Sequence, residues 1–262
     1  ANNSGDIYDP AFVDRVAASV AKCASEGYEM AIVVGAGNIW RGRQGGNMDR
    51  VAADRMGMLA TVINSIYMKE AIVRNGRGAV VMSSVPMPPM AENYSSGAAK
   101  AYLDEGKIVI LGCGLGIPFL STDTAGAVRA AEIGADAMLM AKNVDYIYTA
   151  DPRKVPNARK LDAITYDEML ELASQGAQVL HNRSVELAKK FKVNLEVVSS
   201  LERKPGTKVK EVTNVEKTNI AGVAKDVTIA RVALVGLQHT PGVAFQVFDL
   251  LSKHNINVDV IL

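Results

Sequence analysis

Residues 137–153, A-M-L-M-A-K-N-V-D-Y-I-Y-T-A-D-P-R, indicate an α/β fold more clearly than any other part of the chain. The segment begins with a continuous apolar run, which is typical of a buried strand. Two tyrosines, Tyr146 and Tyr148, then stand on alternate positions, so both can present a flat ring to a planar base. Asp151 and Pro152 end the element, because proline has no N–H and restricts the residue before it. A strand end that contacts a nucleotide is one interpretation, and a strand end with two half-buried tyrosines is the other.

Apolar strands alternate with helices over most of the chain. Strands are predicted at 29–34, 79–82, 108–111, 137–141 and 195–198. Helices are predicted at 10–27, 48–75, 96–105, 122–134, 167–175 and 184–191. Because the strands are solid apolar runs, they predict a mainly parallel sheet covered by helices on both faces, a three-layer α/β sandwich. Ligands bind such sheets beyond the carboxyl ends of the strands.

The composition is that of an ordinary globular protein. The chain has 262 residues, of which 48% are hydrophobic and 22% charged, enough to bury a substantial core. Its 29 basic and 28 acidic residues give a net charge of +1, which argues against a nucleic-acid or membrane partner. We expect a cytoplasmic location, since no apolar run has the length of a membrane helix and no signal peptide is visible. The two cysteines and three histidines show no metal-ligand spacing, so no protein metal site is predicted.

The first of two glycine-rich loops follows the strand at 29–34 and has the sequence G-A-G-N-I-W-R-G at 35–42. Gly35, Ala36 and Gly37 leave room for backbone N–H groups to approach a phosphate. Arg41 adds a guanidinium that can bind phosphate through two hydrogen bonds. A plain tight turn is the alternative interpretation of the glycines.

The second loop follows the strand at 108–111 and has the sequence G-C-G-L-G-I-P-F-L-S-T-D-T-A at 112–125. Phe119 could form a wall against a base. Ser121 and Thr122 offer hydroxyl groups at a helix N-terminus, which is a natural anion site. For Asp123, a role in capping that helix is the alternative to a role in chemistry.

Together these segments resemble the amino acid kinase family, which includes uridylate kinases, aspartokinases and acetylglutamate kinases. Residues 6–163 resemble uridylate kinase, through both loops and through the helix opening M-D-R-V-A-A-D-R-M-G-M-L at 48–59. This resemblance implies that 35–37 and Arg41 hold nucleotide phosphates and that Asp54 accepts hydrogen bonds from ribose hydroxyls. Without it, Asp54 would be interpreted as a solvated helix residue.

The resemblance also implies that the second loop wraps the uracil of UMP and meets the transferred phosphate. The acceptor contacts implied there are Gly116, Phe119, Ser121 and Thr122, with Asp123 near the reaction centre. Many uridylate kinases carry G-T-G-N-P at this point, where this chain has G-L-G-I-P. If the two missing polar side chains read the base, its recognition here must depend on backbone groups.

On the donor side, the segment V-D-Y-I-Y-T-A-D-P-R at 144–153 matches the part of the family that packs against ATP. The implied ATP contacts are Gly37, Lys142, Asn143, Tyr148 and Asp151. Lys142 is equally well interpreted as a phosphate ligand or as a solvated charge.

The implied reaction is direct phosphoryl transfer from ATP, with Mg²⁺ bound to the ATP, and Arg41 and Asp123 are the predicted catalytic residues. The family's first strand carries a lysine and a glycine turn that hold the β- and γ-phosphates. Nothing before Ile7 matches that strand. If the chain truly starts at Ala1, its activity should be poor or absent.

From residue 165 to 262 the chain resembles aspartokinase instead. The matching segments are Y-D-E-M-L-E-L-A at 166–173 with its continuation to 190, and P-G-T at 205–207. Residues 232–262 resemble the first βαβ unit of an ACT domain, with strands predicted at 230–235 and 256–262 and a helix at 241–255. We therefore predict a kinase domain over 1–212 and a partial ACT-like unit over 220–262. The charged segment 208–217 is predicted to leave the main domain.

Three functions follow in order of preference. The first is phosphorylation of UMP by Mg-ATP, because the acceptor-binding segments are of the uridylate kinase type. The second is phosphorylation of aspartate with regulation through the ACT-like unit. The third is a non-catalytic or chimeric regulatory or oligomerisation protein. The resemblance also implies a homo-oligomer, either a hexamer or a dimer.

Overall fold

The computed structural model describes residues 6–40, 45–174, 177, 179–200, 204–211, 222–223, 243–254 and 256. The chain divides into two compact units, Ala1–Lys225 and Asp226–Leu262. In the second unit the described element is helix α7, Val243–Lys253. This helix lies within the predicted range 241–255. The strand predicted at 230–235, and all of the strand predicted at 256–262 except Ile256, lie outside the described residues.

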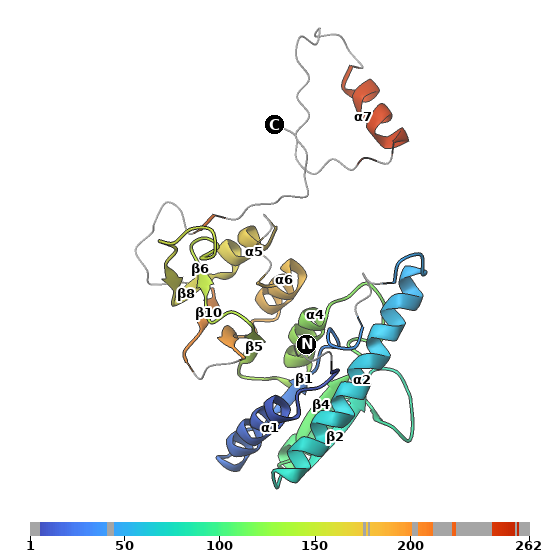
Figure 1. Ribbon diagram of the computed structural model, residues 1–262, viewed down its shortest axis with the longest axis vertical. Coiled ribbons are helices and arrows are strands. Elements are labelled where there is room, and N and C mark those ends of the chain that lie inside the picture. The colour runs from blue at the N-terminus through green and yellow to red at the C-terminus, as the bar shows by residue number, and fades with distance from the viewer. Residues whose placement is uncertain are drawn as a thin grey trace. The chain divides into compact units, whose positions relative to one another are not determined.

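The first unit alternates strands and helices, as predicted (Figure 1). Its described helices are α1 (Pro10–Ser25), α2 (Arg50–Arg74), α3 (Ser96–Asp104), α4 (Thr122–Ile133), α5 (Tyr166–Ser174) and α6 (Asn182–Lys190). Its described strands are β1 (Ala31–Val33), β2 (Ala79–Ser83), β3 (Glu92–Asn93), β4 (Ile108–Gly112), β5 (Met138–Lys142), β6 (Ile147–Tyr148), β7 (Lys160–Leu161), β8 (Ala163–Thr165), β9 (Leu195–Ser199) and β10 (Thr207–Lys210).

The first sheet has the order β1-β4-β2-β3, and each neighbouring pair is parallel. Its central strand β4 is buried along its whole length, as the apolar run I-V-I-L predicts. Helices α1 and α2 run side by side (Figure 1) and share a core cluster with β4 that includes Ala17, Ile72 and Ile110. On the other face, Leu103 of α3 packs with Val109 of β4. The predicted α/β fold with a parallel sheet between helices is therefore confirmed.

The second sheet has the order β5-β9-β10-β8. Strand β5 is parallel to β9, and β10 is antiparallel to β9 and parallel to β8. Met140, Val197 and Val209 lie in one core cluster with residues of α4, α5 and α6. Leu139, the alternate residue of β5, is exposed. Because successive side chains of a strand point to opposite faces, the helices α4, α5 and α6 cover one face of these strands.

The prediction that residues 208–217 leave the main domain is wrong for their first part, because Thr207–Lys210 forms strand β10 inside the second sheet. Thr207 and Val209 are buried, while Lys208 and Lys210 are exposed. The two lysines made the segment look solvated, although they occupy the outer positions of a strand with period two. Residues 212–217 lie outside the described residues.

Capping side chains and a glycine determine where the helices beside the sheet edge begin and end. Asp49 caps α2 by accepting a hydrogen bond from the N–H of Ala52 (3.0 Å), and Ser121 caps α4 by accepting from Thr124 (3.1 Å). Gly134 ends α4 with φ of +71°, the left-handed conformation that favours glycine. Among the described helices, none combines the length and apolar character needed to span a membrane.

Candidate functional site

The candidate site is built where β1, β4 and β5 end, because the loops that follow these strands carry most of the predicted residues. Arg41, the predicted catalytic and phosphate-binding residue, lies outside the described residues. The other predicted residues are described, and they fall into an acceptor side and a donor side.

The first glycine-rich loop turns sharply after β1. The carbonyl of Ala36 accepts hydrogen bonds from the N–H groups of Ile39 and Trp40, both at 2.9 Å. Ala36 itself is buried, whereas Gly35 and Gly37 are exposed. A Cβ added to Gly35 would lie 3.8 Å from Oγ1 of Thr122, so this loop lies beside the N-terminus of α4. The structure therefore brings two predicted acceptor segments together, although they are far apart in the sequence.

The second loop depends on left-handed backbone conformations. Cys113, Gly114 and Gly116 have φ values of +63°, +55° and +78°. A Cβ on Gly116 would lie 3.2 Å from the Cβ of Ser84, so both its conformation and its surroundings require glycine. This close packing fixes the loop against the end of β2.

Phe119 also has a positive φ, +67°, and its side chain is 60% exposed. A large aromatic residue rarely adopts this conformation, and such strain concentrates at functional positions. Its N–H donates to Oδ2 of Asp54 at 2.9 Å, while Nε of Arg50 donates to Oδ1 at 2.9 Å. The Arg50 guanidinium lies 5.9 Å from the centre of the Phe119 ring. Two predicted acceptor residues from different elements, Asp54 and Phe119, are thus in direct contact.

Asp123, in the first turn of α4, and Lys142, at the end of β5, form an ion pair. Nζ of Lys142 lies 2.9 Å from Oδ1 and 2.7 Å from Oδ2 of Asp123, and both side chains are about three-quarters buried (25% and 23% exposed). Asp123 does not supply the helix cap, because Ser121 does. The charge on Lys142 is therefore held in the site by a carboxylate of the predicted reaction centre.

The tyrosines of the donor segment are already engaged by their own hairpin. Strands β6 and β7 pair in antiparallel fashion, and Nζ of Lys160 lies 4.3 Å from the ring centre of Tyr146 and 6.0 Å from that of Tyr148. Asp145 accepts from the hydroxyl of Tyr148 at 2.8 Å and from Lys160 at 2.6 Å. The hydrogen bond from Lys160 lowers the pKa of Asp145, and burial raises the pKa of Tyr148. Lys160 therefore holds its positive charge over the face of the Tyr146 ring.

Asp151 closes a turn in this structure. Its Oδ1 accepts from the backbone N–H and from Nε of Arg153, both at 3.0 Å, and its Oδ2 accepts from Nη2 at 3.1 Å. These hydrogen bonds lower the pKa of the Asp151 carboxyl. Asn143, the remaining predicted donor contact, is exposed just after β5. The hairpin and the turn give the donor segment a defined shape without a nucleotide.

One buried cluster at the site has no signal in the sequence. Arg129 on α4 is buried, pairs with Glu132, and lies 3.8 Å from the ring centre of Tyr94. Its Nη2 donates to Oγ of Ser84 at 2.7 Å, and Ser84 donates to the carbonyl of Gly114 at 2.6 Å. Burial, together with the hydrogen bond to Glu132, raises the pKa of Tyr94 to about 12. An arginine on an amphipathic helix is normally exposed, so its role in supporting the second loop could not be inferred from sequence.

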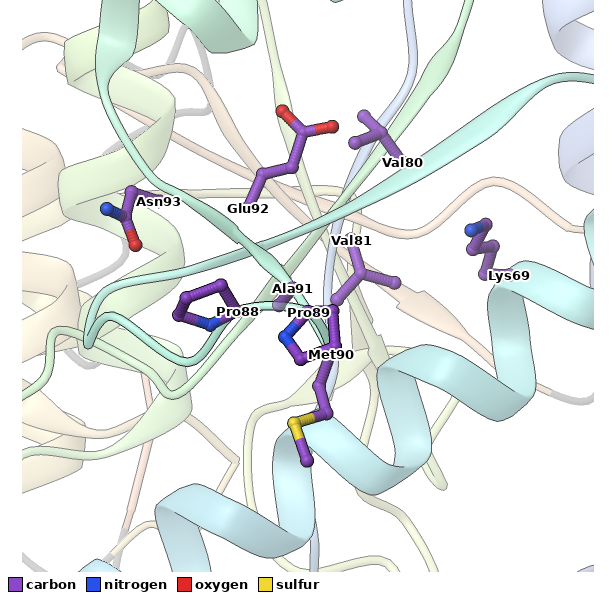
Figure 2. Close-up of a pocket in the computed structure, with 9 residues that line it drawn as sticks. All are labelled: Lys69, Val80, Val81, Pro88, Pro89, Met90, Ala91, Glu92 and Asn93. Atoms are coloured by element: carbon purple, nitrogen blue, oxygen red, sulfur yellow. The ribbon is translucent and has the colours of Figure 1, made fainter.

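A cavity of about 410 Å³ lies elsewhere, beside β2 and the segment that leads to β3. Figure 2 shows Lys69 of α2 on one side and Pro88 and Asn93 on the other. Its lining residues are Lys69, Val80, Val81, Pro88, Pro89, Met90, Ala91, Glu92 and Asn93, none of which was predicted to bind a substrate. Among the described residues, no group of three or more His, Cys, Asp or Glu side chains could hold a metal ion.

The parallel sheet with glycine-rich loops at its carboxyl edge defines an α/β protein of the class that binds ligands at that edge. The sequence profile of the amino acid kinase family matches residues 2–199. The chain belongs to the amino acid kinase family.

Relatives within the family are similar over most of their length. A uridylate kinase of Brucella anthropi is 44% identical over 195 residues, which cover 73% of this chain and 79% of the relative. A uridylate kinase of Mesorhizobium japonicum is 41% identical over 202 residues, 76% of this chain and 82% of the relative. These identities agree with the resemblance predicted for the first part of the chain.

Solved structures resemble the fold in the same way. UMP kinase from Bacillus anthracis has a TM-score of 0.76 at 30% identity, covering 81% of this chain and 92% of that one. Aspartate kinase from Synechocystis has a TM-score of 0.62 at 27% identity, covering 79% of this chain but 38% of that one. Similarity to both predicted relatives is therefore confirmed, and it is greater for UMP kinase.

Proposed function

We propose that this phosphotransferase moves the γ-phosphoryl group of ATP to UMP. The observation that carries the proposal is the meeting of three separated acceptor segments at one sheet edge. Gly35 lies beside Thr122, and Asp54 holds the backbone of Phe119. The uridylate kinase relatives, 41–44% identical, support UMP as the acceptor.

On the acceptor side, the backbone N–H groups of 35–37 and the guanidinium of Arg41 would hold the UMP phosphate. Asp54 would accept from the ribose hydroxyls, since an ionised carboxylate has more acceptor sites than Arg50 and Phe119 use. Phe119 would cover the uracil from its exposed position. Ser121 and Thr122 would add hydroxyl groups at the N-terminus of α4, and Gly116 would let the loop approach the base.

At the reaction centre, Lys142 and Asp123 would act as a pair. A lysine ammonium held by a largely buried carboxylate is pre-oriented to stabilise charge on the transferring phosphoryl group. Mg²⁺ bound with ATP would neutralise part of the phosphate charge. Gly37, Asn143, Tyr148 and Asp151 remain the proposed contacts of ATP.

A coupled assay of ADP release tests the proposal, with UMP, aspartate or no acceptor present. We expect turnover that requires UMP, and we expect Arg41→Ala to reduce it by at least tenfold. Turnover with aspartate alone would contradict UMP as the acceptor. A folded protein without turnover would support the non-catalytic alternative.

We also propose that the chain self-associates through α2. The outer face of this helix carries Met56, Leu59, Ile63 and Ile66, of which Leu59 and Ile63 are 55% and 53% exposed. Because these residues are three, four and three positions apart, they form one apolar stripe along the helix. The order of these intervals is the same whether the helix is followed forwards or backwards. An antiparallel copy would therefore pair Met56 with Ile66 and Leu59 with Ile63, as a two-fold axis requires. The order of any larger assembly and a cytoplasmic location stay predictions.

The domain assignment is likewise a proposal. A kinase domain over 1–212 and an ACT-like unit over 220–262 are supported by the division of the structure between Lys225 and Asp226. Helix α7 supports the helical part of the ACT-like unit.

A further inference from the structure

The inner face of α2 carries three polar side chains where β1 and β4 end. Thr61, Asn64 and Ser65 are 4%, 7% and 0% exposed. A buried polar group costs stability unless it is hydrogen-bonded. The hydrogen-bond partner of each of these side chains therefore shows which segment of the chain it holds in place.

Asn64 holds the first glycine-rich loop. Its Nδ2 donates to the carbonyl of Gly35 at 2.7 Å and to Oδ1 of Asn38 at 2.7 Å, and its Oδ1 accepts from Nδ2 of Asn38 at 3.3 Å. One buried side chain therefore binds the loop at Gly35 and again at Asn38. Both partners lie outside α2.

Thr61 holds the second loop. Its Oγ1 accepts from the N–H of Cys113 at 2.7 Å, at the residue where the chain enters the left-handed turn. The same hydroxyl donates to the carbonyl of Met58, which orients it toward Cys113. The packing here is tight, because a Cβ on Gly112 would lie 3.1 Å from atoms of Val62 and Ser65.

Ser65 differs from these two residues. Its hydroxyl donates to the carbonyl of Thr61 within the helix, at 2.8 Å. Ser65 is therefore a buried polar residue on the same helical face whose hydrogen bond reaches neither loop.

The two loops follow neighbouring parallel strands, since Val33 of β1 pairs with Leu111 of β4. We infer that Thr61 and Asn64 are positioning residues, which use one rigid helix to hold the phosphate loop and the base loop at a fixed spacing. The inference rests on the proposed function, in which the phosphate and the base of one nucleotide contact different loops.

The positions of the two loops matter especially in this chain, because Leu115 and Ile117 supply no polar side chain that could bind the base. Base recognition then depends on backbone groups of the second loop. Backbone groups can distinguish one base from another only if the loop that carries them is rigid. Thr61 should therefore affect discrimination between bases, whereas Asn64 should affect affinity for every nucleotide monophosphate.

The test compares Asn64→Leu, Thr61→Val and the matched control Ser65→Ala in the full chain. Binding of UMP and CMP is measured by titration calorimetry, and amide exchange of 35–40 and 112–116 by mass spectrometry. We expect Asn64→Leu to weaken both nucleotides by the same factor, roughly tenfold, and to speed exchange in 35–40 only. Thr61→Val should lower the preference for UMP over CMP severalfold and speed exchange in 112–116 only. Ser65→Ala should match the wild type in both measurements, and Thr61→Ser, which keeps the hydroxyl, should restore the preference.

Equal effects of all three variants on both nucleotides would overturn the inference, because they would reflect general packing of α2. Unchanged binding and exchange in Thr61→Val and Asn64→Leu would also overturn it, and UMP binding by the wild type would then leave the proposed function intact. A wild type that binds neither nucleotide would contradict the proposed function, while the exchange measurements would still decide whether each residue holds its loop. If Asn64→Leu does not fold, Asn64→Ser takes its place with the same expected result.

Discussion

The ion pair between Asp123 and Lys142 places opposite charges at the proposed reaction centre. We predict that Asp123→Asn and Lys142→Met each lower kcat for UMP phosphorylation by roughly 100-fold, because a pre-organised charge at a reaction centre contributes that much to catalysis. Each substitution leaves one charge of a largely buried pair without its partner, so the melting temperature should fall, and kcat is measured well below the unfolding transition. The matched control is Lys189→Met, which breaks the exposed pair of Lys189 with Asp167. A similar loss of kcat in the control would contradict the assignment.

Tyr94 gives a prediction for the dependence of stability on pH. Its pKa is raised from 10.0 to about 12 in the folded state by burial and by its hydrogen bond to Glu132. Between these values the unfolded chain loses the phenolic proton while the folded chain keeps it, so the free energy of unfolding falls as pH rises through this window. Urea unfolding at pH 9 and pH 11 should show a steeper fall for the wild type than for Tyr94→Phe. Parallel curves would show that Tyr94 does not cause the fall.

The sequence predicted that the two glycine-rich loops share one sheet edge, but not how their residues are held there. The shared edge could be predicted because loops after neighbouring parallel strands lie at the same end of a sheet, whereas the roles of the glycines, Asp54 and Phe119 stay predictions from the resemblance to a known family. The burial of Arg129 and its role beside the second loop could not be predicted, because its partners come from α4, the end of β2 and the segment before α3. Contacts between segments far apart in the sequence decide its burial, and no local pattern records them.

Among the elements, α2 carries a different proposed role on each of two faces, loop positioning on the inner one and self-association on the outer one. Its outer stripe predicts that Leu59→Lys combined with Ile63→Lys shifts the protein to monomers in sedimentation velocity, because charges would be buried in the paired helices. Met90→Lys, which places a charge at another exposed apolar residue, is the control and should leave the assembly unchanged. Monomeric wild-type protein would contradict self-association.

Strand β10 contributes to the core of the second sheet. Val209→Ala should lower the free energy of unfolding by about 2 kcal/mol, because it removes buried methyl groups from the core of the second sheet. Lys208→Ala, one position away and exposed, should change it by less than about 0.5 kcal/mol. Denaturant unfolding measures both, and equal effects would place Val209 outside the core.

Long apolar strands and long helices were predictable because their periodicity is local. The four-residue strand T-K-V-K and the hairpin of β6 and β7 were not, because each has few residues and exposes charged ones. Their partners, in the first case β8 and β9, decide that they are strands.

For the whole molecule, the described residues of the candidate site all lie in the first unit. We therefore predict that a chain ending at Lys225 keeps the UMP affinity and kcat of the full chain within about twofold. Steady-state kinetics of the two chains measures this. A large loss of activity in a folded truncated chain would show that the second unit contributes to the reaction.

The place of β10 in the second sheet also bears on synthesis at the ribosome. The strands of the first sheet are complete once residue 112 has left the exit tunnel, and that half can fold early. The second sheet must wait, because its described partner for β8 is a strand that ends at Lys210. A nascent chain halted between these points would carry an unfinished sheet edge, which is the stage at which chaperones protect emerging proteins from aggregation.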